Sequence, residues 1–274
     1  MQEENCLNCG VKLSPGQKFC YNCGQKLNLG RITLTHLFVD FFRIISHAER
    51  GLLNLAKGLA IDPGGVAIEY VEGKRKKYFN PFTFLAVCIT VMVLLNSLIK
   101  PYAGLPVPDP NVASFMPDQH TRELYELTVK RIANMQRVGN HNVNLFTVLV
   151  SPYFAYFLWL FFKRRGRNVA EIMVAYILYT GFANVISTII FSPFLAMVRH
   201  TGAYYPLFAL SLFAQTMYYS WGLKKFLGFN TTGGYFKVLG ALTLIGVIGF
   251  ILLIVVLFFY VYHGAFSVFP YLNG

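Results

Sequence analysis

The chain has 274 residues, of which 55% are hydrophobic, 16% are aromatic and only 13% are charged. Soluble domains carry about 25% charged residues, so this composition excludes an ordinary soluble enzyme and indicates a protein that crosses a membrane several times. The formal net charge of +12 invites a nucleic-acid interpretation, but the positions of the cations argue against it, as described below.

Two Cys-x2-Cys pairs, each followed by glycine, lie within the first 29 residues: "CLNCG" at Cys6 and Cys9, and "CYNCG" at Cys20 and Cys23. Four thiolates make a closed tetrahedral site that leaves no position for a catalytic water. We therefore expect residues 1–29 to form a small zinc ribbon of short β-hairpins, or knuckles, around a structural Zn2+ ion. Iron suits the same ligands, and two disulfides are the alternative in an oxidising compartment.

Residues 30–78 carry amphipathic patterns that are too short to cross a bilayer. Apolar residues recur at helical spacing over residues 34–45 and 52–59, and "DPGG" ends the second pattern. We expect these helices to lie in the cytoplasmic headgroup layer, and the alternative is a small soluble domain packed on the ribbon. Glu69 and Glu72 are expected to pair with nearby cations. The residues that we expect to anchor the segment to anionic lipid headgroups are Lys74, Arg75, Lys76, Lys77 and Tyr78.

Residues 79–274 form the predicted transmembrane domain. Five segments are long and apolar enough to span a bilayer, at approximately 81–99, 145–162, 170–197, 204–222 and 238–262. Pro81 is expected in the first turn of the first of these helices. The external loop 100–144 contains an amphipathic pattern for which Gly139 is the expected helix end. The sequence therefore predicts an all-α polytopic membrane protein with five transmembrane helices.

Lysine and arginine are concentrated on one side of these segments. The basic stretches 74–77, 163–167 and 224–237 share a side with the N-terminus, whereas loop 100–144 is nearly neutral and residues 264–274 are uncharged. Because cytoplasmic loops are enriched in Lys and Arg, we expect a cytoplasmic N-terminus and a periplasmic C-terminus in a bacterial inner membrane. This distribution accounts for most of the net charge, so no nucleic-acid partner is expected.

The five segments contain no acidic or basic residue near their middle, which argues against a proton- or ion-coupled transporter. They do contain neutral polar residues, which usually form hydrogen bonds between helices. The alternative is that they line a polar groove between the third and fourth helices. The candidate groove residues are Tyr176, Thr180, Asn184, Ser187 and Gln215.

The first third of the chain resembles a known family. "CLNCG…FCYNCGQ", "RITLTHLFVDFF" and "DPGGVAIEYVEGKRKKYFNPFTFL" are similar to the domain of unknown function 3667 family, which comprises zinc-ribbon multi-pass inner-membrane proteins of Bacteroidota. The resemblance covers roughly residues 6–85, and beyond them only the hydropathy is similar. It implies the fold and the membrane location, and it implies no reaction.

No catalytic motif is visible: the chain lacks G-x-S-x-G, a phosphate-binding glycine loop and H-E-x-x-H. We therefore expect a non-enzymatic scaffold or adaptor, whose cytoplasmic zinc ribbon and basic surface recruit a protein partner. The alternative function is a facilitator or transporter of a lipid-like or neutral solute through the polar groove.

Overall fold

The computed structural model describes residues 5–14, 16–27, 49–101, 108–116 and 118–263. The helix that we expect over residues 34–45 lies outside them. The helices of the described part are α2 (Glu49–Ile61), α3 (Pro63–Val71), α4 (Pro81–Ile99), η1 (Pro110–Phe115), α5 (Gln119–Phe162), η2 (Lys163–Arg165), α6 (Val169–Val198), α7 (Tyr204–Phe226) and α8 (Thr232–Tyr262).

The expected β-hairpins of the ribbon are not confirmed, because the described residues contain no strand. Each knuckle is instead closed by one isolated antiparallel bridge, Asn5 with Lys12 and Phe19 with Lys26. A loop this short leaves room for a single bridge beside the turn. Hydrogen bonds within the turn hold the remainder of each knuckle in place.

Side-chain caps explain where the helices at the first membrane segment begin. The carboxylate of Asp62 accepts a hydrogen bond from the backbone N–H of Gly65 and caps α3. Asn80 caps α4 in the same way, and Pro81 occupies the first turn, as predicted, because it has no N–H to satisfy there. The sequence "DPGG" therefore ends α2 and starts α3 within two residues.

The prediction that Gly139 ends an outer helix is wrong. Helix α5 runs without a break from Gln119 to Phe162, so the outer amphipathic helix and the second predicted span are one helix of 44 residues. One glycine costs a helix interior only about 1 kcal/mol relative to alanine, so Gly139 by itself does not end α5. Pro152 also lies inside α5.

Among the described residues, three helices are long and apolar enough to cross a membrane: α4, α6 and α8. The prediction of five spans is therefore not confirmed. Helix α7 is less apolar because it carries Ser211, Gln215 and several tyrosines. The segment at 145–162 lies partly in residues whose side chains the structure does not describe, so its crossing of the membrane stays a prediction.

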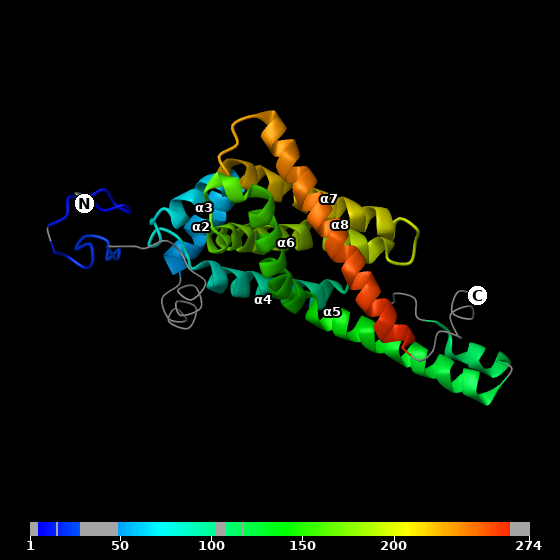
Figure 1. The fold of residues 1–274 in the computed structure, drawn as a ribbon. Helices are drawn as coiled ribbons and strands as arrows, with labels where there is room; N and C mark the ends of the chain where they lie inside the picture. The colour runs from blue at the N-terminus through cyan, green and yellow to red at the C-terminus, as the bar shows by residue number, and fades with distance from the viewer. Residues whose placement is uncertain (1–4, 15, 28–48, 102–107, 117, 264–274) are drawn as a thin grey trace.

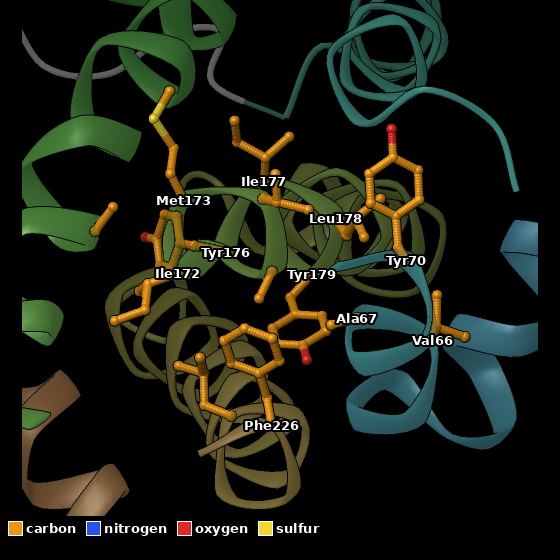
Figure 2. Close-up of a cluster of buried hydrophobic side chains, with 14 of the residues drawn as sticks. Val66, Ala67, Tyr70, Ile172, Met173, Tyr176, Ile177, Leu178, Tyr179 and Phe226 are labelled. Carbon is orange, nitrogen blue, oxygen red and sulfur yellow. The ribbon is translucent and has the colours of Figure 1, made fainter. Parts of the chain in front are cut away.

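Helix α6 lies at the centre of the bundle and packs against α3, α4, α5 and α7. Its first three turns are buried on every side, and Tyr176 and Tyr179 point to different sides of the helix (Figure 2). Helix α3 and the end of α7, which carries Phe226, close this core at the end where α6 begins.

Two glycines allow α3 and α7 to cross closely. A Cβ atom on Gly64 would lie 2.8 Å from the carbonyl oxygen of Gly222. A Cβ atom on Gly222 would lie 3.2 Å from the Cβ atom of Pro63 in α3 and 2.8 Å from the ring of Tyr179 in α6. These distances are closer than a packed Cβ atom ordinarily allows. The hydrogen atom of glycine therefore permits the contact that brings α3 onto the bundle.

Candidate metal centre and the junction that holds it

The first knuckle is a tight turn held by its own backbone. The N–H of Cys6 donates to the carbonyl of Val11, and the N–H of Gly10 donates back to the carbonyl of Cys6, both at 2.8 Å. Gly10 has a φ of +74°, a backbone conformation that residues other than glycine rarely adopt. The glycine after the second cysteine is therefore required for the turn.

The second knuckle repeats this arrangement. The N–H of Cys20 donates to the carbonyl of Gln25 at 2.7 Å, and the N–H of Gly24 donates to the carbonyl of Cys20 at 2.8 Å. Gly24 has a φ of +68°. Two copies of one local structure thus present two sulfur atoms each.

The four sulfur atoms of Cys6, Cys9, Cys20 and Cys23 lie within 4.8 Å of one another. Across the two knuckles, the Cys6 and Cys23 sulfurs are 3.7 Å apart and the Cys9 and Cys20 sulfurs are 3.6 Å apart. A tetrahedron with metal–sulfur distances of about 2.3 Å has edges of about 3.8 Å. A disulfide needs about 2.05 Å, so these distances suit a four-thiolate metal site and not a pair of disulfides.

The knuckle backbone also prepares one thiol for metal binding. The N–H of Val11 lowers the pKa of Cys9 to about 6, whereas burial raises the pKa of Cys6 to about 11. The two thiols thus differ in how readily they lose a proton. A bound cation would hold both as thiolates, since metal binding releases thiol protons.

The ribbon contacts the rest of the protein through Gln25. This side chain is buried, and its oxygen accepts a hydrogen bond from the backbone N–H of Lys76 at 3.1 Å. The two residues are 51 positions apart. The metal site is therefore held against the basic segment 74–77 that precedes α4.

Glu69 organises that basic segment. Its carboxylate accepts hydrogen bonds from Lys74 at 2.9 Å, from Lys77 at 2.6 Å and from the hydroxyl of Tyr78 at 2.6 Å. Burial raises the pKa of Glu69, but the hydrogen bonds from Lys77, Tyr78 and Lys74 outweigh burial and bring the pKa down to about 2. The expected pairing of Glu69 with nearby lysines is confirmed.

The proposed lipid-anchoring residues therefore differ in their surroundings. Lys74 and Lys77 pair with Glu69, and Tyr78 is buried. Arg75 is half-buried, and Lys76 is exposed. Contact of the five residues with lipid stays a prediction, for which Lys76 and Lys77 are the two exposed side chains.

Acidic residues of the same segment reach two distant loops. Lys225, at the end of α7, forms an ion pair of 2.5 Å with Asp62, and Arg167, before α6, pairs with Glu72 at 3.3 Å. The expected pairing of Glu72 is thus confirmed, with a partner from another loop. Arg165 also stacks 3.8 Å from the ring centre of Phe229. Three basic stretches that are far apart in sequence therefore meet at one end of the bundle.

The candidate groove residues lie mostly within helix contacts. The amide nitrogen of Gln215 donates to the hydroxyl of Ser187 at 3.0 Å. Tyr176 is buried and stacks on Phe154, with ring centres 5.1 Å apart. Thr180 is buried and Asn184 is half-buried. The structure thus brings Gln215 and Ser187 together as a bond between α6 and α7.

Sequence reasoning missed several residues that make contacts between distant segments. Nothing in the pattern distinguished Gln25 from any other surface glutamine. The Asp62 carboxylate could have been identified, because an aspartate before Pro-Gly is a common helix cap. The hydroxyl of Ser192 donates to Asn96 at 3.2 Å and joins α6 to α4. The neutral polar residues of the predicted segments indicated bonds of this kind, but the sequence did not indicate this pair.

Comparisons with known proteins agree with this geometry. A family model described as "Protein of unknown function (DUF3667)" matches residues 49–93, and a zinc-ribbon domain model matches residues 5–27. The resemblance seen in the sequence is thereby confirmed over these two segments. Neither the curated proteins nor the solved structures yield a match.

We expect Cys20→Ser to lower the metal content of the purified protein from about one ion per chain to well below one, because a closed site needs all four thiolates. The matched control is Cys88→Ser, which changes a buried cysteine of α4 that lies outside the cluster. Elemental analysis of both variants measures the effect. Equal metal content in Cys20→Ser and Cys88→Ser would rule out the four-sulfur site.

We expect Glu69→Gln to lower the free energy of unfolding by about 1 kcal/mol at pH 7, because it removes two partly exposed ion pairs. The pKa of Glu69 is below its ordinary value of 4.5, so its stabilisation is fully present above pH 4.5 and is lost as the pH falls toward 2. The difference from the original protein should therefore shrink below pH 4.5.

Thermal unfolding in detergent between pH 7 and pH 3 measures this difference. The control is Glu123→Gln, on the exposed surface of α5, which should change stability little at any pH. A Glu69→Gln effect that stays constant down to pH 3 would contradict the assignment.

Proposed function

We propose that this protein is a non-enzymatic membrane adaptor whose zinc ribbon recruits a protein partner in the cytoplasm. The observation that carries the proposal is the ribbon itself. It is attached at one edge through Gln25, yet it exposes Leu7, Phe19 and Tyr21, with exposed fractions of 40%, 58% and 67%. Exposed aromatic side chains are typical of protein-binding surfaces.

The metal in this proposal is a structural zinc ion. The ribbon segment is too short to bury a hydrophobic core, so the fold of the ribbon depends on the metal. Zinc supplies rigidity there, and four protein ligands leave no position for substrate or water. The function of the site is therefore to shape a surface.

The proposed topology has five membrane crossings. The contacts of Asp62 with Lys225 and of Glu72 with Arg167 bring the start of α4, the α5–α6 turn and the end of α7 to one end of the bundle. Helices α4 and α6 therefore leave this end, and α5 and α7 return to it. This path supports crossings by α5 and α7 in addition to the three most apolar helices.

The orientation follows from the charge at that end. The α5–α6 turn and the end of α7 contribute exposed cations there, including Arg164, Arg165 and Lys225. Lys and Arg are enriched on the cytoplasmic side of membrane proteins, which favours a cytoplasmic ribbon in a bacterial inner membrane. A reducing solvent would also keep the four thiols available for metal.

We favour the adaptor over a facilitator for a neutral or lipid-like solute. Two of the candidate groove residues bond to each other: Ser187 of α6 accepts from Gln215 of α7, whose carbonyl oxygen accepts from the hydroxyl of Tyr219 at 3.3 Å. Side chains that satisfy one another offer less to a passing solute.

A photo-crosslinking phenylalanine analogue at Tyr21 tests the adaptor. In native membranes, we expect it to capture a discrete protein, and Phe19→Ser should reduce the capture at least about fivefold, as loss of a central aromatic contact does. The metal content must stay unchanged in Phe19→Ser. The matched control places the analogue at Leu53 of α2, which is 74% exposed but lies outside the ribbon. Capture of no protein from Tyr21, or equal capture from Leu53, would contradict the proposal.

A further inference from the structure

A pocket of about 370 Å³ lies between α5 and the last turns of α8. These two segments lie side by side at the end of the bundle opposite the ribbon (Figure 1). It is lined by Lys130, Arg131, Ala133, Asn134 and Tyr260. Its volume is in the range of sites that bind small molecules. Neither the ribbon nor the basic segment 74–77 contributes to it.

Arg131 fixes one wall of the pocket. Its Nη1 atom donates to the carbonyl oxygens of Val261 at 3.2 Å and His263 at 2.7 Å, which are among the last carbonyls of α8. A cation at a helix C-terminus is stabilised there by the helix dipole. The guanidinium therefore joins α5 to α8, and the position of its charge at the pocket is defined.

The polar groups of the pocket suit a phosphate. Lys130 is exposed and carries three donors on a flexible stem, and Arg131 has further N–H groups on Nη2 and Nε. Asn134 lies one turn after them on α5 and offers an amide. Among the residues that the structure describes, none that lines the pocket is acidic. Cationic and amide donors together favour an anion over a cation or a neutral ligand.

The adjoining surface of α8 is apolar. Val256 and Phe259 are 63% and 60% exposed, and α8 is one of the three helices apolar enough to cross the membrane. Tyr260, at the pocket wall, is 48% exposed and lies near the end of this helix, where tyrosines favour the headgroup layer. A ligand in the pocket would thus meet hydrogen-bond donors of the protein at its polar head and the apolar surface of α8 along its hydrocarbon chains.

From this arrangement, we propose that the α5–α8 pocket binds the phosphate of an anionic membrane lipid, with the acyl chains lying along α8. The shared chemistry is a phosphate ester, which could also arrive as a soluble molecule. The exposed apolar face of α8 favours the lipid, because a soluble phosphate would make no use of it.

Native mass spectrometry of the full chain released from detergent micelles tests the proposal with three probes. Dioleoyl phosphatidylglycerol has both phosphate and chains, dioleoylglycerol lacks the phosphate, and glycerol 3-phosphate lacks the chains. We expect phosphatidylglycerol to bind at least about tenfold more tightly than either other probe. Dioleoylglycerol loses the attraction to Lys130 and Arg131, which is worth roughly fivefold for each cation near a lipid phosphate, and glycerol 3-phosphate loses the apolar contact of the chains with α8.

Two variants change the pocket in different ways. Lys130→Gln removes the exposed charge and should weaken phosphatidylglycerol binding about fivefold. Ala133→Phe fills the pocket without changing its charge and should weaken binding by a similar factor. The matched control is Lys100→Asn, which removes an exposed cation at the end of α4 outside the pocket and suits the left-handed backbone there.

We expect Lys100→Asn to bind within about twofold of the original protein, because this charge lies outside the pocket. The proposal is overturned if Lys130→Gln and Ala133→Phe bind phosphatidylglycerol as tightly as the original protein. It is equally overturned if dioleoylglycerol or glycerol 3-phosphate binds as tightly as phosphatidylglycerol.

Discussion

The arrangement of this protein depends on the acidic residues of a short segment before the first membrane helix. Three of the 12 acidic residues of the chain lie within residues 62–72, and each forms an ion pair with a lysine or arginine. Asp62 and Glu72 reach cations of distant loops, whereas Glu69 gathers the local lysines. In a chain with a net charge of +12, these carboxylates offset the repulsion among basic loops that meet at one end of the bundle.

The position of the metal site depends on the same acidic segment and on the basic residues 74–77 that follow it. Gln25 accepts its hydrogen bond from Lys76, and the position of Lys76 follows from the turn that Glu69 holds together. With a metal bound at the four thiolates the ribbon would be rigid, and it is fixed at one edge and exposed on the face that carries Phe19 and Tyr21. An adaptor requires this combination, since a partner that binds a fixed surface loses less entropy than one that must order it.

The sequence predicted local structure better than contacts between distant segments. Cysteine spacing predicted the four-sulfur cluster, and Pro81 predicted the start of α4, because both signals lie within a few residues of the structure they specify. Gly139 failed as a helix end because one glycine costs a helix only about 1 kcal/mol, and the 44-residue helix α5 continues through it. The contact of Gln25 with Lys76 could not be predicted, since it depends on how a loop approaches a turn 51 residues away.

Asp62 and Lys225, which are 163 positions apart, form the ion pair that joins α3 to the end of α7. A zero-length carbodiimide cross-linker joins a carboxylate to an amine only where the two are in contact. Digestion and peptide mass spectrometry should then recover an Asp62–Lys225 amide together with the local Glu69–Lys74 amide, which serves as the internal control. Recovery of the Glu69 product without any Asp62–Lys225 product would contradict the account.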